Sequence, residues 1–303
     1  MSAAILSPNS LVLVEEAADE IARLDSVCLS RPAGVGLALR FILIADLHDR
    51  TPETFRTLAA SHADPYHEPS VQPAARQWLA LLSTEERRVR GGALLSVARF
   101  ADAAPDLATY PDRSRLEAIW HEERGSRPVL MRALDSAAWS SSTAVGELSA
   151  TLLLCAGGRT DRARFLPFTS VSAAVRAECT NAWRTGDTEP WARAALAAAA
   201  QRARRLRESV QAIAAPGERD EALLDPIGRA AITARRALAQ LRVSLAVTMP
   251  SLAEDLSLSR PAAADALERL VDLGLAREVT GRARDRVYAW AAACAVADAA
   301  LAS

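Results

Sequence analysis

The sequence contains no lysine, and all 36 of its basic residues are arginine. A GC-rich coding sequence is a sufficient reason for that bias, so we attach no binding partner to it. The formal net charge is −1, which excludes the overall positive charge by which many proteins attract nucleic acid or membranes. A role on DNA would therefore need a local cluster of arginines.

Cysteines and long apolar runs are scarce as well. The four cysteines lie far apart without a Cys-x-x-Cys pair, and three have apolar, Ala-rich neighbours, so we expect buried thiols rather than disulfides or metal ligands. The longest apolar stretch, "AGVGLALRFILIADLH", is interrupted by Arg40 and is too short to span a bilayer. The first residues lack a signal-peptide pattern. These features predict a cytoplasmic protein without a membrane partner.

Alanine is abundant, and half of the residues are hydrophobic although only 5% are aromatic. Ala and Leu are strong helix formers, so this composition favours a mainly α fold. At 303 residues the chain is long enough for two domains. We expect a helical domain over residues 1–218 and a second domain over residues 219–303, which contains a linker helix and a small α+β unit.

Helical periodicity is clearest after "GDTEP". Asp187 or Thr188 can cap a helix there, and Pro190 falls in the first turn, where its missing N–H costs nothing. The opposite face is rich in arginine, which we interpret as a solvated surface rather than a binding surface. The apolar stripe of this helix consists of Trp191, Leu196, Ala199, Leu206, Val210 and Ile213.

The C-terminal segment "SLSRPAAADALERLVDLGLAREVTGRARDRVYAW" has a distinctive order of signals. Thr248 and Pro250 begin a short helix, and Ser259 caps a second helix that ends at Gly274. The expected buried stripe of this second helix consists of Ala264, Leu267, Leu270 and Val271. Next, "LAREV" and "DRVYAW" have the composition of two strands joined by the turn "TGRAR". Two helices joined by a tight turn and followed by a hairpin predict a winged helix–turn–helix.

In that motif the second helix enters the DNA major groove by its N-terminal residues, and the wing contacts the backbone or the minor groove. Arg260 could pair with guanine, and Ser259 could reach a phosphate. Ala262 and Ala263 offer a thymine methyl only apolar contact. The candidate DNA-binding residues are Ser259, Arg260, Ala263 and Arg269 on the helix and Arg282, Arg284 and Arg286 in the wing. Asp265 and Asp285 oppose this reading, and the alternative is a winged helix used for packing, for dimerisation or for binding a protein partner.

The segment "LSATLLLCAGGRTDRARFLPFTSVSAAVRAECTNAWRTGDTEPWARAALAAAAQRARR" resembles the stretch that follows the active-site motif in Fic (Fido) domain proteins. In that family a helix is followed by a Leu-Pro segment, a second helix that ends in a Gly-Asp-x-Glu-Pro-Trp turn, and a long helix. The resemblance covers about Val145–Trp290 and is closest to a degenerate bacterial group with a helix–turn–helix tail (DUF1612 type). It implies a Fic-like helical bundle followed by a winged helix.

Fic enzymes transfer AMP from ATP to a protein hydroxyl through the signature His-Pro-Phe-x-x-Gly-Asn-Gly-Arg, whose His removes the hydroxyl proton. At the corresponding place this sequence reads "SSSTAVG", in which only Gly146 matches the signature. The later "AGGRTDRAR" follows the helix that the signature should precede and has no His-Pro-Phe, so we interpret it as a helix end and a loop. The sequence therefore predicts a Fic-like regulator without catalysis, and a divergent AMP transferase is the alternative.

No other segment predicts a cofactor or a metal. His62 and His67, with Asp64 and Glu68, lie in a Pro-rich stretch without regular ligand spacing, which favours a solvated loop. The fragment from Gly34 to Gly36 does not establish a phosphate-binding loop. We expect double-stranded DNA as the partner, and a homodimer would suit paired half-sites.

Overall fold

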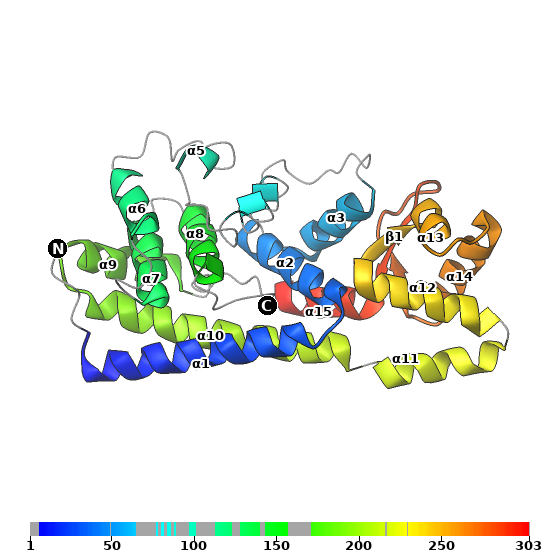
Figure 1. Ribbon diagram of the computed structural model, residues 1–303, viewed down its shortest axis with the longest axis horizontal. Helices are drawn as coiled ribbons and strands as arrows, with labels where there is room; N and C mark the ends of the chain where they lie inside the picture. The colour runs from blue at the N-terminus through cyan, green and yellow to red at the C-terminus, as the bar shows by residue number, and fades with distance from the viewer. Residues whose placement is uncertain are drawn as a thin grey trace. The chain divides into compact units, whose positions relative to one another are not determined.

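The computed structural model describes residues 6–48, 50–64, 77, 80–81, 84–85, 88, 97–100, 113–122, 128–139, 143–156, 171–215, 217–228 and 230–302. Most of these residues are helical, and the strands among them form a small three-stranded antiparallel sheet near the C-terminus (Figure 1). The prediction of a mainly α fold is confirmed. The chain divides into two compact units: unit 1 comprises Met1–Leu29 and Gln77–Arg207, and unit 2 comprises Ser30–Arg76 and Glu208–Ser303.

Unit 1 is helical throughout its described part. Its elements are α1 (Pro8–Leu29), α5 (Val97–Phe100), α6 (Arg113–Trp120), α7 (Val129–Trp139), α8 (Thr143–Ala156), α9 (Ala173–Arg184) and most of α10 (Glu189–Ala214). Helix α10 begins directly after Thr188, and all six residues of its predicted apolar stripe are buried. The amphipathic prediction for this helix is therefore confirmed.

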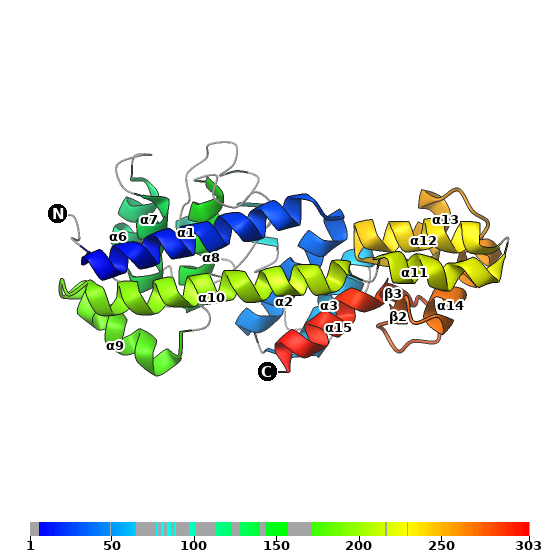
Figure 2. The ribbon, with the colours of Figure 1, turned by 90° about the horizontal axis from the view of Figure 1, so that it is seen from below.

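Helices α1 and α10 lie side by side (Figure 2). Arg204 of α10 pairs with Glu16 and Glu20 of α1, and Arg207 also contacts Glu20 at 3.2 Å. At the start of α10 the Glu189 carboxylate accepts hydrogen bonds from the Ser10 hydroxyl and the Ser7 backbone N–H, which lower the pKa of Glu189. Part of the predicted solvated arginine face is thus a contact between two helices.

Helix α7 is the centre of the polar network in unit 1, because three tryptophan indoles donate hydrogen bonds to three consecutive residues of this helix. The pairs are Trp191 with the Leu134 carbonyl (3.1 Å), Trp183 with the Asp135 carboxylate (2.8 Å) and Trp120 with the Ser136 hydroxyl (2.9 Å). Buried indole N–H groups need such partners. These bonds fix α6, α9 and α10 against α7.

Unit 2 combines an early pair of helices with the C-terminal segment. Its elements are α2 (Ala33–His48), α3 (Pro52–Ala63), α11 (Gly217–Leu224), the 3₁₀ turn η2 (Asp225–Ile227), α12 (Ala230–Ser244), β1 (Ala246–Thr248), α13 (Met249–Asp255), α14 (Arg260–Asp272), β2 (Ala276–Glu278), β3 (Val287–Trp290) and α15 (Ala291–Leu301). Strand β3 is central, and it pairs with both β1 and β2 in the order β1-β3-β2.

The described residues of 30–64 pack against the C-terminal part of the chain. Helix α2 contacts α12 and α15, and α3 contacts β1, β3 and α15. The sequence motifs predict a division at residue 218, whereas the packing assigns these early helices to the C-terminal unit. Such pairing between distant segments leaves no local sequence pattern.

Candidate nucleic-acid interface

Helices α13 and α14 are joined by a tight turn over residues 256–258. Thr248 caps α13 in a reciprocal capping box with Ser251. Ser259 caps α14 by accepting a hydrogen bond from the Ala262 N–H at 3.4 Å, and Pro261 lies in the first turn. Both predicted helix starts are confirmed, because each cap satisfies backbone N–H groups that a helix N-terminus leaves unpaired.

Helix α14 ends at the glycine that the sequence indicated. Gly274 has a φ of +71°, and its N–H bonds to the Val271 carbonyl while the Leu275 N–H bonds to the Leu270 carbonyl. This is a Schellman arrangement, in which the left-handed position favours glycine. The chain is thereby turned directly from α14 into strand β2.

The inward face of α14 is rotated from the predicted one. The buried residues are Ala263, Ala266, Leu267 and Leu270. Ala264 is only half-buried, and Val271, predicted to be inside, is 37% exposed. Ala263 has 0% exposure, so its methyl group cannot contact a base, and the prediction of Ala263 as a DNA-binding residue is wrong.

The remaining helix candidates differ in how their side chains are engaged. Arg260 is exposed in the first turn of α14, and the described part of the chain provides it with no hydrogen bond or ion pair. Arg269 binds both oxygens of Asp265, which raises the pKa of Arg269 and holds its guanidinium along the helix. The Ser259 hydroxyl accepts the capping bond. Arg260 is therefore the helix residue best placed to meet an anion.

The turn between β2 and β3 presents its arginines to solvent. Residues 281–286 are all exposed, including Arg282, Arg284 and Arg286. The turn is ordered at its base, where the Glu278 carboxylate accepts the N–H groups of Thr280 at 2.6 Å and Gly281 at 3.0 Å. Its far side is held by the Arg286 Nε, which donates to the Arg282 carbonyl at 2.9 Å. A short positively charged turn thus joins β3 to β2, the strand that packs against α14.

The exposed charges of α14 are not uniform. Beyond Arg260, the outer face carries Asp265, Glu268 and Asp272. Carboxylates repel phosphate, so only the N-terminal end of α14 and the neighbouring turn are suited to a nucleic-acid backbone. This distribution restricts any DNA contact to a small part of the unit.

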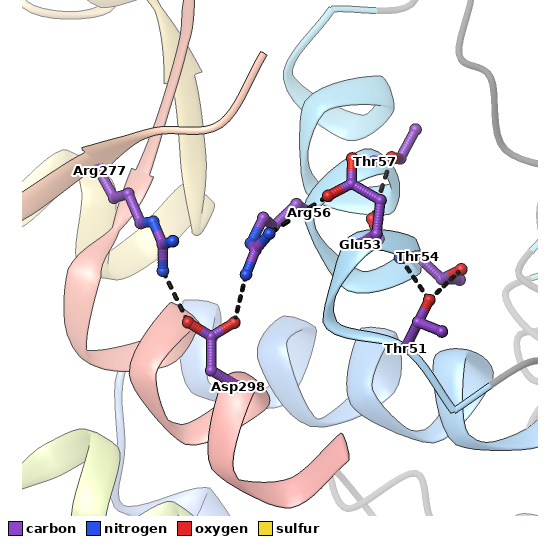
Figure 3. Close-up of polar contacts among 7 residues, drawn as sticks. All are labelled: Thr51, Glu53, Thr54, Arg56, Thr57, Arg277 and Asp298. Carbon is purple, nitrogen blue, oxygen red and sulfur yellow. Dashed lines mark hydrogen bonds and ion pairs between the residues drawn. The ribbon is translucent and has the colours of Figure 1, made fainter. Parts of the chain in front are cut away.

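The base of β2 is anchored by a cluster of charges that the sequence motifs do not indicate. The Asp298 carboxylate on α15 accepts hydrogen bonds from Arg277 of β2 and Arg56 of α3, both at 2.7 Å (Figure 3). Burial raises the pKa of Asp298, but the bonds and charges of the two arginines outweigh burial and leave it below its ordinary value. No local signal predicts the cluster because its members lie on three separate elements.

We expect Asp298→Asn to destabilise unit 2 by about 1 kcal/mol at neutral pH, a modest value because the carboxylate is partly exposed. A carboxyl with a pKa lowered by folding stabilises the fold above its unfolded-chain pKa of about 3.9. This contribution is lost as the pH falls through the folded-state value, so the difference between wild type and variant should shrink in acid. Denaturant unfolding at several pH values measures it.

Glu53→Gln is the matched control, because Glu53 pairs with the same Arg56 at 3.2 Å but its side chain is 69% exposed. We expect it to change stability by less than about 0.5 kcal/mol. Equal effects of the two substitutions, or an Asp298→Asn effect that does not depend on pH, would show that the cluster contributes no specific ion pairing.

The other predicted sites offer little chemistry. His62 packs edge-on against Phe41, with ring centroids 5.6 Å apart, while His67 and Glu68 lie outside the described residues. The described residues contain no group of three or more metal-ligating side chains. Cys28, Cys155 and Cys294 are buried and form no disulfide within the described residues, as predicted for three cysteines, and burial raises the pKa of Cys294 to about 11. In the described part of the chain, no helix combines the length and the hydropathy needed to cross a membrane.

No known protein family matches this sequence, and no curated protein matches it either. The function must therefore be argued from the arrangement of the residues themselves.

Proposed function

We propose that the protein is a DNA-binding regulator that contacts double-stranded DNA through a winged helix formed by α12–α14 and the β2–β3 hairpin. The observation that carries this proposal is the exposed Arg260 in the first turn of a capped helix that follows a tight helix–helix turn. In helix–turn–helix proteins this position faces base edges in the major groove. An arginine there can donate two hydrogen bonds to guanine.

The hairpin supports the same docking mode. Its three arginines stand on a turn whose base is fixed by Glu278, so they concentrate positive charge at the end of a hairpin whose strand β2 packs against α14. Arg282, Arg284 and Arg286 would contact phosphates or enter a minor groove. The overall charge of −1 does not oppose this docking mode, because screening by salt limits the distance over which each charge acts to about 8–10 Å at physiological ionic strength.

We infer further that unit 1 is a Fic-like bundle that has lost its catalytic loop. The order of α8, α9, the turn at Gly186 and the long α10 supports this inference, since it agrees with the order of helices that the sequence resemblance implies. Gly146, the one residue matching the signature, lies within α8, and the adjacent Glu147 is fully buried in an ion pair with Arg176. These residues do not favour the transferase alternative.

The test is selection of bound fragments from random double-stranded DNA and from sheared genomic DNA by the full-length protein at physiological salt. We expect an enriched motif. Arg260→Ala should weaken binding to that motif roughly tenfold, because a bidentate arginine–guanine contact contributes about 1–3 kcal/mol. Replacing the three hairpin arginines by alanine should lower the slope of log affinity against log salt by about 0.9 for each phosphate that the variant no longer neutralises.

Arg193→Ala is the control for loss of a positive charge, because Arg193 is an exposed arginine on α10 of unit 1. It should leave both affinity and slope unchanged. If no motif is enriched, or if Arg260→Ala and the triple substitution both bind as wild type does, the DNA proposal fails. The acidic outer face of α14 would then favour the second candidate, a surface for a protein partner.

A further inference from the structure

Unit 2 contains a pocket of about 560 Å³ whose walls come from five elements. Helix α11 contributes Arg219 and Leu223, and the turn after α14 contributes Leu273. Strand β2, the end of β3 and the first turns of α15 complete the lining. The volume falls within the range of roughly 300–1,000 Å³ that is typical of small-molecule sites.

Most of the lining is apolar. Leu223 lines the pocket and is 38% exposed. Trp290 and Leu275 also line it and are more deeply buried. On α15, small side chains such as Ala292 and Ala295 leave the space open. An organic group that fills it would remove this apolar surface from water, which favours binding.

The charges in the pocket favour an anion. Two carboxylates line it, and both are engaged: Asp220 pairs with Arg242 at 2.9 Å, and Asp298 accepts from Arg56 and Arg277. Arg219 also lines the pocket, and it has no hydrogen bond or ion pair within the described residues. The charge left without a partner at the pocket, within the described part of the chain, is therefore positive.

We propose that this pocket binds a small organic acid, with its apolar body against Leu223, Leu275 and Trp290 and its carboxylate paired with Arg219. A charge-assisted hydrogen bond to a guanidinium is stronger than a neutral one, and apolar lining with a single polar anchor is the usual design of a small-molecule site. No chemical step is involved, and the site acts by binding alone.

The position of the pocket also makes it suited to regulation. Its wall includes Leu273 and Gly274, which end α14, and Arg277 of β2, which begins the hairpin. A bound acid would favour one arrangement of these two elements over another, which is how a ligand shifts a conformational equilibrium. This regulatory step rests on the proposed function, whereas the binding itself does not.

The test is isothermal titration of the full-length protein with phenylbutyrate and with straight-chain alkanoates from butyrate to decanoate. The uncharged phenylbutanol is the probe for the role of the carboxylate. We expect at least one acid to bind, phenylbutanol to bind more weakly than phenylbutyrate, and Arg219→Gln to weaken acid binding roughly tenfold. Ala295→Trp should abolish binding, because Ala295 is an exposed lining residue and an indole at this position would occupy space that the acid needs.

Ala299→Trp is the matched control, because Ala299 is exposed on the same helix but does not line the pocket. It should bind as wild type does. The proposal is overturned if none of the acids binds, if Ala295→Trp binds like Ala299→Trp, or if Arg219→Gln leaves the affinity unchanged.

The regulatory step has its own readout. The affinity for the selected DNA motif is measured with and without saturating acid in wild type and in Ala295→Trp, and a change confined to wild type is expected. Equal DNA affinity under both conditions would overturn regulation. A protein that binds the acid but no DNA would refute the proposed function while the binding site stands.

Discussion

Trp191→Ala is expected to lower the free energy of unfolding of unit 1 by about 3–5 kcal/mol. The Trp191 side chain is fully buried, its indole N–H donates to the Leu134 carbonyl at 3.1 Å, and the Arg176 guanidinium lies 5.4 Å above its ring. Arg176 also pairs with Glu147, which has 0% exposure. Removing the indole therefore leaves a cavity beside a buried ion pair.

The effect can be located by hydrogen exchange, since a protein with two compact units need not unfold in a single step. Amides of α7–α10 should exchange faster in the variant. Trp191→Phe keeps most of the ring contact and should lose markedly less stability, and Arg193→Gln, an exposed change two residues away, should stay within about 0.5 kcal/mol of wild type. A Trp191→Ala loss below about 1 kcal/mol would contradict the packing described for α10.

Gly34→Ala is expected to destabilise unit 2 by about 2–3 kcal/mol, although alanine is normally preferred over glycine in a helix by about 1 kcal/mol. Gly34 is buried at the start of α2, where a Cβ would collide with the backbone oxygen of Arg242 at the end of α12. The Leu245 nitrogen lies 3.3 Å from the same position. Both obstacles are backbone atoms, so the two helices must move apart to admit the methyl group.

Ala33→Gly is the control, because it removes a methyl group at the neighbouring residue of α2, which is exposed. There the methyl group is exposed to solvent, and a loss of no more than about 1 kcal/mol is expected from helix propensity. The diagnostic result is faster hydrogen exchange in α2 and α12 of Gly34→Ala, with α7–α10 unchanged. If Gly34→Ala stabilised the protein, propensity would outweigh the close approach, and α2 and α12 would have to pack less tightly than described.

Sequence patterns correctly predict the helices and caps that depend on interactions within a few residues. The stripe from Trp191 to Ile213 needs only helical periodicity, and Thr248, Ser259 and Gly274 act as caps through bonds within a few residues. These interactions depend on short sequence windows, so a pattern search finds them.

The sequence-based predictions fail where the residue types suit more than one arrangement, or where the contacts join residues far apart in the sequence. Three consecutive alanines, 262–264, suit either an inner or an outer face, so the sequence pattern places Ala264 inside α14 in place of Ala263, although Leu267 and Leu270 are buried as predicted. Strand β1 has only three residues, too few for a strand pattern to emerge before α13. The cap at Ser259 is enough to place Arg260 in the first turn of α14. The Asp298 cluster, in contrast, joins residues that only the tertiary structure brings together.

The partnership of α2 and α3 with the C-terminal segment has a consequence for synthesis of the chain. Ribosomes add roughly 5–20 residues per second, so α2 and α3 leave the ribosome on the order of ten seconds before α12 and α15 can cover them. During that interval the apolar run Phe41–Ala45, which is buried in the folded chain, lacks its partners. We therefore expect nascent chains stopped before residue 230 to be held by chaperones or degraded.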